Sequence, residues 1–188
     1  MSYLFFDTET TGLPKKFNAP ISDLDNWPRM VQIAWILSDD FGNIISQEEY
    51  IIKPKDFVIP LESSAIHGID NLRANREGKD LKDVLDVFNY ALNFSQPDLV
   101  AHNIIFDKNI VAAEFLRANI LSNFLDLNFI CTMKGSVDFC ALPNKKFPKL
   151  SDLYFKLFGE YFKNAHNALD DVIACYKSFF ELKKRGVL

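Results

Sequence analysis

Two carboxylates lie two residues apart near the start of the chain, in the segment Phe-Phe-Asp-Thr-Glu-Thr-Thr-Gly. Asp7 and Glu9 follow the short apolar run from Tyr3 to Phe6, which predicts a strand buried on both faces. Side chains two residues apart on a strand point to the same side, so the pair can flank a hard cation such as Mg²⁺. Acidic residues at strand ends are also common turn formers, so the spacing alone is a weak signal. A buried strand rarely tolerates unpaired charge, and this favours metal binding.

A third carboxylate, Asp107, stands where a predicted strand at Leu99 to Ala101 gives way to a predicted helix. The helix dipole favours a carboxylate in the first turn, which is one interpretation. The other is a metal ligand, because sites in open α/β sheets form at the carboxyl ends of strands. His102 and Asn103 are expected to support Asp107.

The segment His-Asn-Ala-Leu-Asp-Asp, residues 166–171, opens the last predicted helix, which runs from about residue 167 to 185. A single histidine before a helix is more often structural than catalytic, and Asp170 and Asp171 could be favourable first-turn charges. Asp171 can face inward with the apolar residues of the helix. An inward carboxylate near other carboxylates requires a cation.

Taken together, these segments resemble the three exonuclease motifs of the DEDDh family. The motifs are Asp-Thr-Glu-Thr-Thr-Gly, then His-Asn-x-x-Phe-Asp, then His-x-Ala-x-x-Asp, and the match spans residues 3 to 171. The family includes the proofreading subunit of bacterial replicative polymerases, ribonuclease T and oligoribonuclease. The resemblance implies an α/β, ribonuclease-H-like fold with a mixed five-stranded sheet and helices on both faces. Three strands would form an antiparallel meander, extended by two parallel strands.

The resemblance also implies a division of roles. Four carboxylates would hold two divalent cations, Mg²⁺ with Mn²⁺ as a substitute: Asp7, Glu9, Asp107 and Asp171. His166 would be the general base, since a neutral imidazole can accept a proton from water at physiological pH. Two cations would stabilise the attacking and leaving oxygens of a phosphoryl displacement. Asp171, and not Asp170, falls on the motif spacing.

By the same resemblance, the turn after the acidic pair meets the 3′-terminal nucleotide. Gly12 would allow close backbone approach, and Leu13 would wedge against a base. Ile66 to Ile69 resembles a family segment beside that nucleotide, although a turn role for His67 is equally favoured. The residues expected to bind substrate are Thr8, Thr10, Gly12, Leu13, His67, Asn103 and Phe106. For three lysines a solvated loop is favoured over a phosphate contact: Lys145, Lys146 and Lys149.

The remaining pattern supplies the elements that must position these residues. Val31 to Leu37 and Ile44 to Lys53 predict a hairpin around the turn Phe-Gly-Asn. Helices are expected at 81–92, 104–119 and 150–158, and a last strand at 128–131. Residues 14–29 should form a loop, whose contact with substrate or a partner is left open, and 132–149 is unassigned. The whole of 1–188 is expected to be a single exonuclease domain.

Composition narrows the class of protein. A formal net charge of −4 argues against a broad basic surface, so a nucleic-acid contact should be local and metal-assisted. The 3 cysteines lack any C-x-x-C pair, which favours free thiols in a reducing compartment. The sequence shows no membrane-spanning run and no cleavable signal. A cytoplasmic protein without a membrane partner is expected.

The favoured function is a 3′→5′ exonuclease on single-stranded ends, DNA more than RNA, in a stand-alone or repair role, releasing nucleoside 5′-monophosphates. The alternatives are a proofreading subunit bound to a DNA polymerase, an RNA-directed exoribonuclease, and a non-catalytic nucleic-acid-binding domain. No tether is expected after the last helix, and the clamp-like Gln96 to Val100 runs into a strand, so polymerase association is less favoured. All five expected catalytic residues are present, which disfavours the non-catalytic domain. The oligomeric state is left open.

Overall fold

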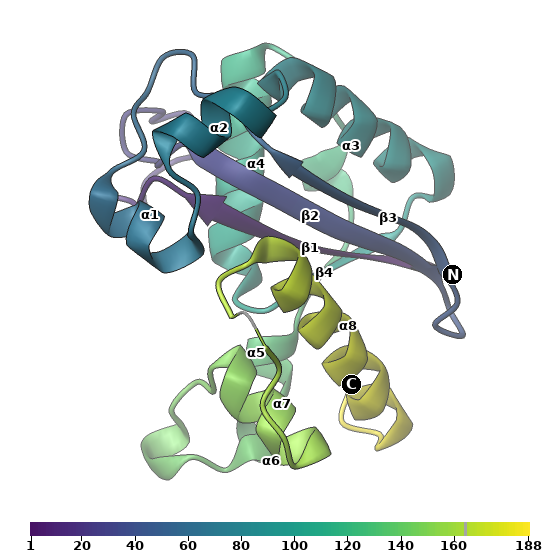
Figure 1. Ribbon diagram of the computed structural model, residues 1–188. Helices are drawn as coiled ribbons and strands as arrows, with labels where there is room; N and C mark the ends of the chain where they lie inside the picture. The colour runs from purple at the N-terminus through teal and green to yellow at the C-terminus, as the bar shows by residue number, and fades with distance from the viewer. Residues whose placement is uncertain (164) are drawn as a thin grey trace.

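The computed structural model describes residues 1–163 and 165–188. Its centre is a five-stranded sheet in the order β3-β2-β1-β4-β5 (Figure 1). The strands are β1 (Ser2–Thr10), β2 (Met30–Asp39), β3 (Ile44–Ile51), β4 (Asp98–Ala101) and β5 (Phe129–Cys131). β1, β2 and β3 pair antiparallel, and β4 and β5 extend the sheet in parallel. This mixed α/β topology confirms the predicted fold.

Helices pack on both faces of the sheet, as predicted. The helices are α1 (Leu61–His67), α2 (Asn71–Glu77), α3 (Leu81–Ser95), α4 (Ile104–Ala118), α5 (Thr132–Gly135), α6 (Val137–Cys140), α7 (Leu150–Phe158) and α8 (Ala168–Lys184). Two 3-10 turns, η1 (Phe124–Asp126) and η2 (Pro143–Lys145), complete the elements. The apolar sides of α3 and α4 share the first core cluster with the sheet, and α8 shares a second cluster on the opposite face. Among the described residues, no helix is long and apolar enough to cross a bilayer.

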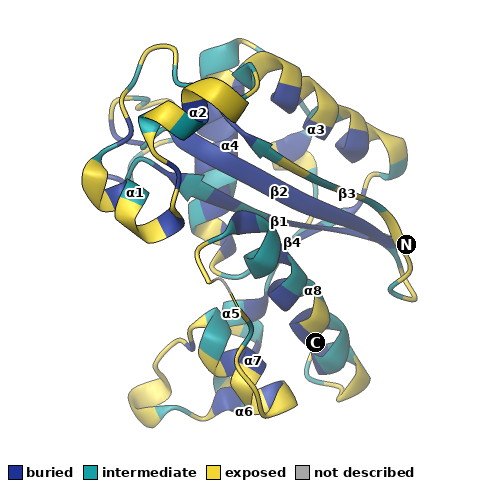
Figure 2. Ribbon diagram, viewed as in Figure 1, coloured by how far each residue is buried: buried dark blue, intermediate teal, exposed yellow. Residues whose placement is uncertain are grey.

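Strand β1 separates the two core clusters because its side chains alternate. Leu4 and Phe6 pack with α3 and α4, whereas Tyr3 and Phe5 pack with α8. Figure 2 shows that buried residues line the central strands and the inward sides of the helices. This alternation decides which helix each residue further along β1 meets.

Asp7 and Glu9 lie at the end of β1, as the sequence predicts. Their backbones pair with Ala34 and Gln32 of β2. This pairing holds both carboxylates on rigid backbone. It also places them on the face that packs against α8.

Two segments differ from the sequence expectation. Helices α1 and α2 were not predicted, and residues 132–149, unassigned from sequence, contain α5, α6 and η2. These helices span three to seven residues each, too short for a full apolar period to be visible. The cysteines are free thiols as predicted, with Cys140 and Cys175 buried and Cys131 half-buried.

Residues 14–29 form the predicted loop, and α4 anchors it. Arg117 donates from Nη2 to the carbonyl oxygens of Leu24 and Trp27, at 2.6 and 2.7 Å. Trp27 is buried and donates from Nε1 to the Pro20 carbonyl at 3.0 Å. These contacts hold the loop against the core cluster that α3 and α4 share with the sheet.

Candidate active site

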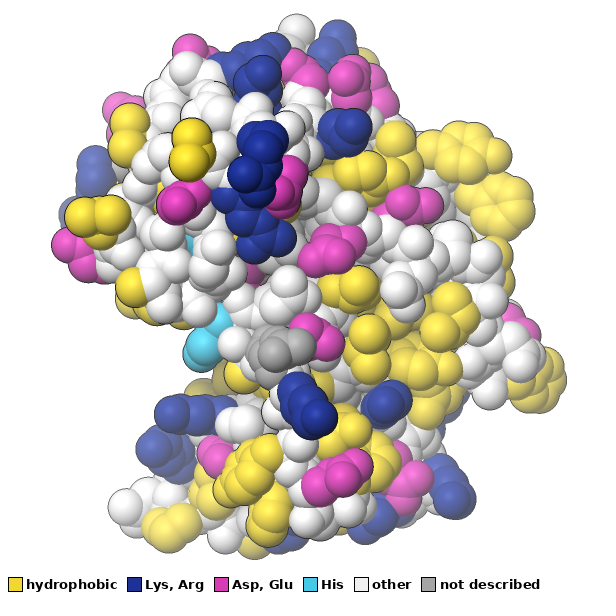
Figure 3. All heavy atoms as spheres, in the orientation of Figure 1, with side chains coloured by type: hydrophobic (Ala, Val, Ile, Leu, Met, Phe, Trp, Pro, Cys, Tyr) yellow, Lys and Arg dark blue, Asp and Glu magenta, His cyan; other side chains and the backbone are white. Residues whose placement is uncertain are grey.

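The predicted catalytic residues come from three separate elements that meet at one end of the sheet. Asp7 and Glu9 lie on the face of β1 that packs against α8, as the alternation of the strand requires. Figure 3 shows the surface hollowed between the part that carries α1 and the part that carries α5 to α7. A histidine (cyan) lies at the inner edge of this hollow.

Asp107 reaches the same end of the sheet from the first turn of α4. It is buried, and its Oδ1 atom accepts two hydrogen bonds from Thr8, from the backbone N–H at 3.0 Å and the hydroxyl at 2.7 Å. Thr8 stands between Asp7 and Glu9 in the sequence. Its side chain points to the α4 face of β1, whereas theirs point to the α8 face. Thr8 thus ties the third carboxylate to the strand that carries the first two.

The start of α8 supplies Asp171 and His166. The backbone N–H of His166 donates to Asp171 Oδ2 at 2.9 Å, which closes the turn before the helix. A ligand atom from each of Glu9, His166 and Asp171 lies within 4.8 Å of the others. These three side chains, from β1 and the α8 segment, form the tightest group of potential metal ligands in the described residues.

Burial and mutual repulsion perturb all four carboxylates. Burial, with the charges of Asp107, Asp171 and Glu9 adding to it, raises the pKa of Asp7 well above its ordinary value. Burial and repulsion from Asp171 and Asp107 raise the pKa of Glu9 to about 8. Burial also raises the pKa of Asp107, against the lowering effect of the Thr8 hydrogen bonds.

For Asp171, burial again raises the pKa, and its bond from the His166 backbone opposes the rise. In the described chain, no Lys or Arg forms an ion pair with any of the four carboxylates. Carboxylate oxygens gathered without a cationic side chain suit a hard divalent cation, which would offset the repulsion. The donor set therefore fits Mg²⁺ or Mn²⁺.

A cavity of about 200 Å³ opens on the Glu9 side of this group. It is lined by six of the seven residues predicted to bind substrate, together with Glu9, Ser63 and Ile66: Thr8, Thr10, Gly12, Leu13, His67 and Phe106. Gly12 has a φ of +143°, a conformation that side-chain-bearing residues rarely adopt. Leu13 is exposed at the rim of the cavity.

His67 ends α1 and is buried in the wall of this cavity. Its Nδ1 accepts the Ile69 N–H at 3.1 Å, so the neutral ring carries its proton on Nε2. Among the described atoms Nε2 has no hydrogen-bond partner. Burial lowers the pKa of His67, which keeps the ring neutral. The backbone of Thr10 opposes this fall in the pKa, so Thr10 lies beside the ring in the wall of the cavity.

A second cavity, of about 340 Å³, opens on the other side of Asp7. Its wall joins Asp7, His166 and Asp171 to residues at the start of α7, including Lys149 and Ser151. Lys149 is exposed at this wall. The carboxylates therefore separate two hollows, one with a buried histidine donor and the other with a lysine.

The polar contacts of His102 differ from the predicted ones. His102 does not contact Asp107, because its Nδ1 lies 3.0 Å from Thr132 Oγ1 and its Nε2 3.0 Å from the Pro148 carbonyl. Burial lowers the pKa of His102 to about 4, so the ring is neutral, and its contact with Pro148 holds the segment before α7. Asn103 is exposed and lines neither cavity. Ser63 was missed, since no motif marks it.

Comparisons with known proteins give the family of the chain. The family model described as "RNase_T: Exonuclease" matches residues 4–179. No curated protein matches the chain.

Three solved structures of exonuclease I share the fold. The first has a TM-score of 0.80 at 22% identity, covering 97% of this chain and 41% of that one. E. coli exonuclease I in complex with a dT13 oligonucleotide has a TM-score of 0.79 at 22% identity. The match covers 98% of this chain and 41% of that structure. The zinc-bound E. coli exonuclease I complex with single-stranded DNA has a TM-score of 0.77 at 22% identity. The match covers 98% of this chain and 40% of that structure. The chain spans about two fifths of the length of these structures.

Proposed function

Because the chain belongs to the exonuclease family whose model spans residues 4–179, we propose that it removes nucleotides from the 3′ end of single-stranded DNA. The reaction is a metal-dependent hydrolysis that releases nucleoside 5′-monophosphates. The observation that carries the proposal is the carboxylate group of Asp7, Glu9, Asp107 and Asp171, gathered with His166 and with no Lys or Arg ion pair among the described residues. The oligonucleotides bound to exonuclease I support DNA as the substrate class.

The four carboxylates would hold two divalent cations, with Asp7 between the Glu9–Asp171 pair and Asp107. When bound, the cations would polarise the scissile phosphate and lower the pKa of the attacking water. Thr8 donates two hydrogen bonds to Oδ1 of Asp107, so Oδ2 would be the atom left to hold a cation. The zinc-bound relative supports a divalent ion, and the oxygen-rich donor set favours Mg²⁺ or Mn²⁺.

His166 is the proposed general base. Its ring lies beside Glu9 and Asp171, where those carboxylates would stabilise the imidazolium formed when the ring takes a proton from water. The side chain is exposed at the hollow, so the proton can pass on to solvent. His166 therefore acts at the water side of the scissile bond.

The cavity beside Glu9 would receive the 3′-terminal nucleotide. The buried ring of His67 forms part of the wall of this cavity and would pack beside the nucleotide. Phe106 and Leu13 provide apolar surface for the base. On the other side of Asp7, Lys149 would meet the next backbone phosphate.

Digestion of a 5′-labelled single strand tests the proposal. With Mg²⁺ or Mn²⁺ the DNA strand should shorten stepwise from its 3′ end, and EDTA should stop the reaction. A matched RNA strand, digested in parallel, measures the preference for deoxyribose. Asp170→Asn, one residue from Asp171, is the matched control because Asp170 lies outside the carboxylate group.

Asp171→Asn should lose nearly all activity, whereas Asp170→Asn should be much milder. Equal losses in the two variants would show that the fourth ligand is misplaced. Intact substrate with either metal, under conditions in which the protein is folded, would overturn the proposed function.

A further inference from the structure

Strand β2 carries one buried amide among apolar residues. Gln32 is fully buried between Val31 and Ile33. Its backbone pairs with Glu9 of β1, so its side chain lies on the same face of the sheet as Glu9. A buried amide destabilises the fold unless its polar atoms are bonded. Gln32 therefore requires partners on the α8 face.

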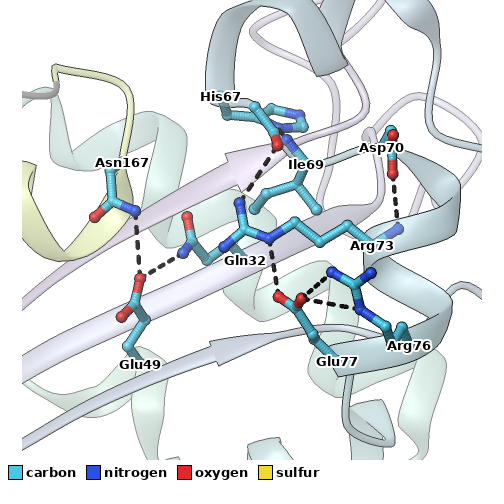
Figure 4. A network of polar contacts seen from close by, with 10 residues as sticks. Gln32, Glu49, His67, Ile69, Asp70, Arg73, Arg76, Glu77 and Asn167 are labelled. Atoms are coloured by element: carbon cyan, nitrogen blue, oxygen red, sulfur yellow. Dashed lines mark hydrogen bonds and ion pairs between the residues drawn. The ribbon is translucent and has the colours of Figure 1, made fainter.

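Both polar atoms of the Gln32 side chain have partners there. Nε2 donates to Glu49 Oε1 of β3 at 2.7 Å, and Oε1 accepts the backbone N–H of Ala168 at 3.2 Å. Figure 4 shows Gln32 and Glu49 side by side, with Asn167 above Glu49. A carboxylate only accepts, so Glu49 fixes the amide with its oxygen toward α8.

The same pair controls the first turn of α8. Ala168 is the first residue of the helix, and its N–H would be unpaired without Gln32. Asn167 caps the next two N–H groups through Oδ1, both at 3.1 Å, and its Nδ2 donates to Glu49 Oε1 at 3.3 Å. The start of α8 is thus bonded to β2 and β3 through side chains.

This anchored turn lies between the two proposed catalytic residues of the α8 segment. His166 directly precedes Asn167 and has a φ of +73°, a left-handed conformation that is uncommon for a residue with a side chain. Asp171 is one turn into the helix and accepts the His166 N–H. Any shift of the helix start would move both side chains relative to Asp7 and Glu9.

We propose that Gln32 and Glu49, which lie outside the three motifs, are positioning residues that hold His166 and Asp171 in register with Asp7 and Glu9. The inference rests on the proposed roles of those four residues and adds the element that aligns them. Loss of the Gln32 contact should reduce kcat by about 10- to 100-fold, the scale seen when a supporting contact of a metal site is removed. The cavity for the terminal nucleotide has no wall from α8, so KM should be unchanged.

The experiment uses Gln32→Leu, which keeps the volume and removes both hydrogen bonds. Turnover, KM and the Mg²⁺ concentration for half-maximal rate are measured at a temperature where thermal unfolding shows each variant to be folded. The expected result is a lower kcat, the wild-type KM and a Mg²⁺ requirement raised about 10-fold or more. A smaller folded fraction would lower turnover but leave the Mg²⁺ requirement unchanged.

Exposed Glu49 provides a second test that does not disturb the core. Glu49→Ala should lower kcat, and Glu49→Gln should restore most of it because the amide oxygen can still accept. Glu48→Ala is the matched control, since Glu48 points to the opposite face and bonds Tyr50. Wild-type kcat and Mg²⁺ requirement in both Gln32→Leu and Glu49→Ala would overturn the inference. An inactive wild-type protein would instead count against the proposed function.

Discussion

Two groups of buried charge lie in this fold, and they are composed in opposite ways. Glu114 of α4 is fully buried, yet it accepts hydrogen bonds from Arg29 Nε at 3.0 Å, Arg117 Nη1 at 3.0 Å and the Met30 N–H at 2.9 Å. Asp107 lies seven residues earlier on the same helix and is also buried. Its bonded partner is a threonine, and its nearest charges are other carboxylates.

The contrast shows what each group is built to do. Around Glu114, two guanidinium groups bond Oε1 of one carboxylate and hold the 14–29 loop, so its charge is neutralised by side chains of the protein, although Oε2 has no hydrogen-bond partner among the described residues. The group around Asp107 consists of four carboxylates with raised pKa values. Their negative charge would be neutralised by a cation from solution. The first group should govern stability, and the second should govern activity.

The largest expected effect is on Asp7. Asp7→Asn removes one of the four carboxylates proposed to hold the cations, so turnover should fall about 10⁴-fold, the scale lost when one member of a catalytic unit is removed. Thermal stability without metal should be equal to or higher than that of the wild type, because repulsion is relieved. A gel assay with calorimetric unfolding checks both, and turnover within tenfold of wild type would contradict the assignment.

His166 comes next. His166→Ala should lower the rate by about 10²- to 10⁴-fold, the usual contribution of a general base. Metal binding should persist, because the carboxylates remain. The measurement is single-turnover cleavage at saturating Mn²⁺, and wild-type turnover would remove His166 from the mechanism.

The Glu114 group should respond in the opposite sense. Glu114→Ala leaves Arg29 and Arg117 partly buried without their partner, which should destabilise the fold by about 3 to 5 kcal/mol. Activity per folded molecule should be retained. Urea unfolding measures the loss, with Asp107→Asn as the matched variant on the same helix, expected to lose activity and keep its stability. The distinction between the two groups would be wrong if Glu114→Ala lost activity and kept its stability while Asp107→Asn lost stability and kept its activity.

The smallest effect concerns pH. A raised folded-state pKa means that the folded protein holds protons that the unfolded chain releases, so the stability contribution is present below the unfolded pKa and is lost as pH rises. For Glu9 that window runs from the ordinary value of 4.5 to about 8. In EDTA the Tm should fall by about 10 °C between pH 5 and 8, since a shift of this size is worth about 3 to 4 kcal/mol over that range. Mg²⁺ should restore it at pH 8, and a Tm that is flat or rises without metal would argue against the shift.

The sequence predicted much of this arrangement because its signals are local. The four carboxylates and His166 fall in three short motifs, and the buried run before Asp7 marks the central strand. Helices α3, α4, α7 and α8 were found because their apolar periods are long enough to see.

The missing parts depend on contacts across the sheet. Gln32 carried one signal, a polar residue inside an apolar strand, but its partners are 17 and 136 positions away. Glu114 looks like an ordinary helix-surface residue until Arg29 and Arg117 are brought beside it. Ser63 belongs to the short α1, and only the folded chain brings it to the cavity beside Glu9.

Calorimetric titration with Mn²⁺ tests most directly whether the carboxylate group is a cation site. The wild-type protein should bind Mn²⁺, and Asp7→Asn should bind it at least about 100-fold more weakly, since a ligand matters more than a supporting contact. Glu114→Gln, which changes a buried carboxylate outside the group, should bind as the wild type does. Equal Mn²⁺ affinity in wild type and Asp7→Asn would contradict the account.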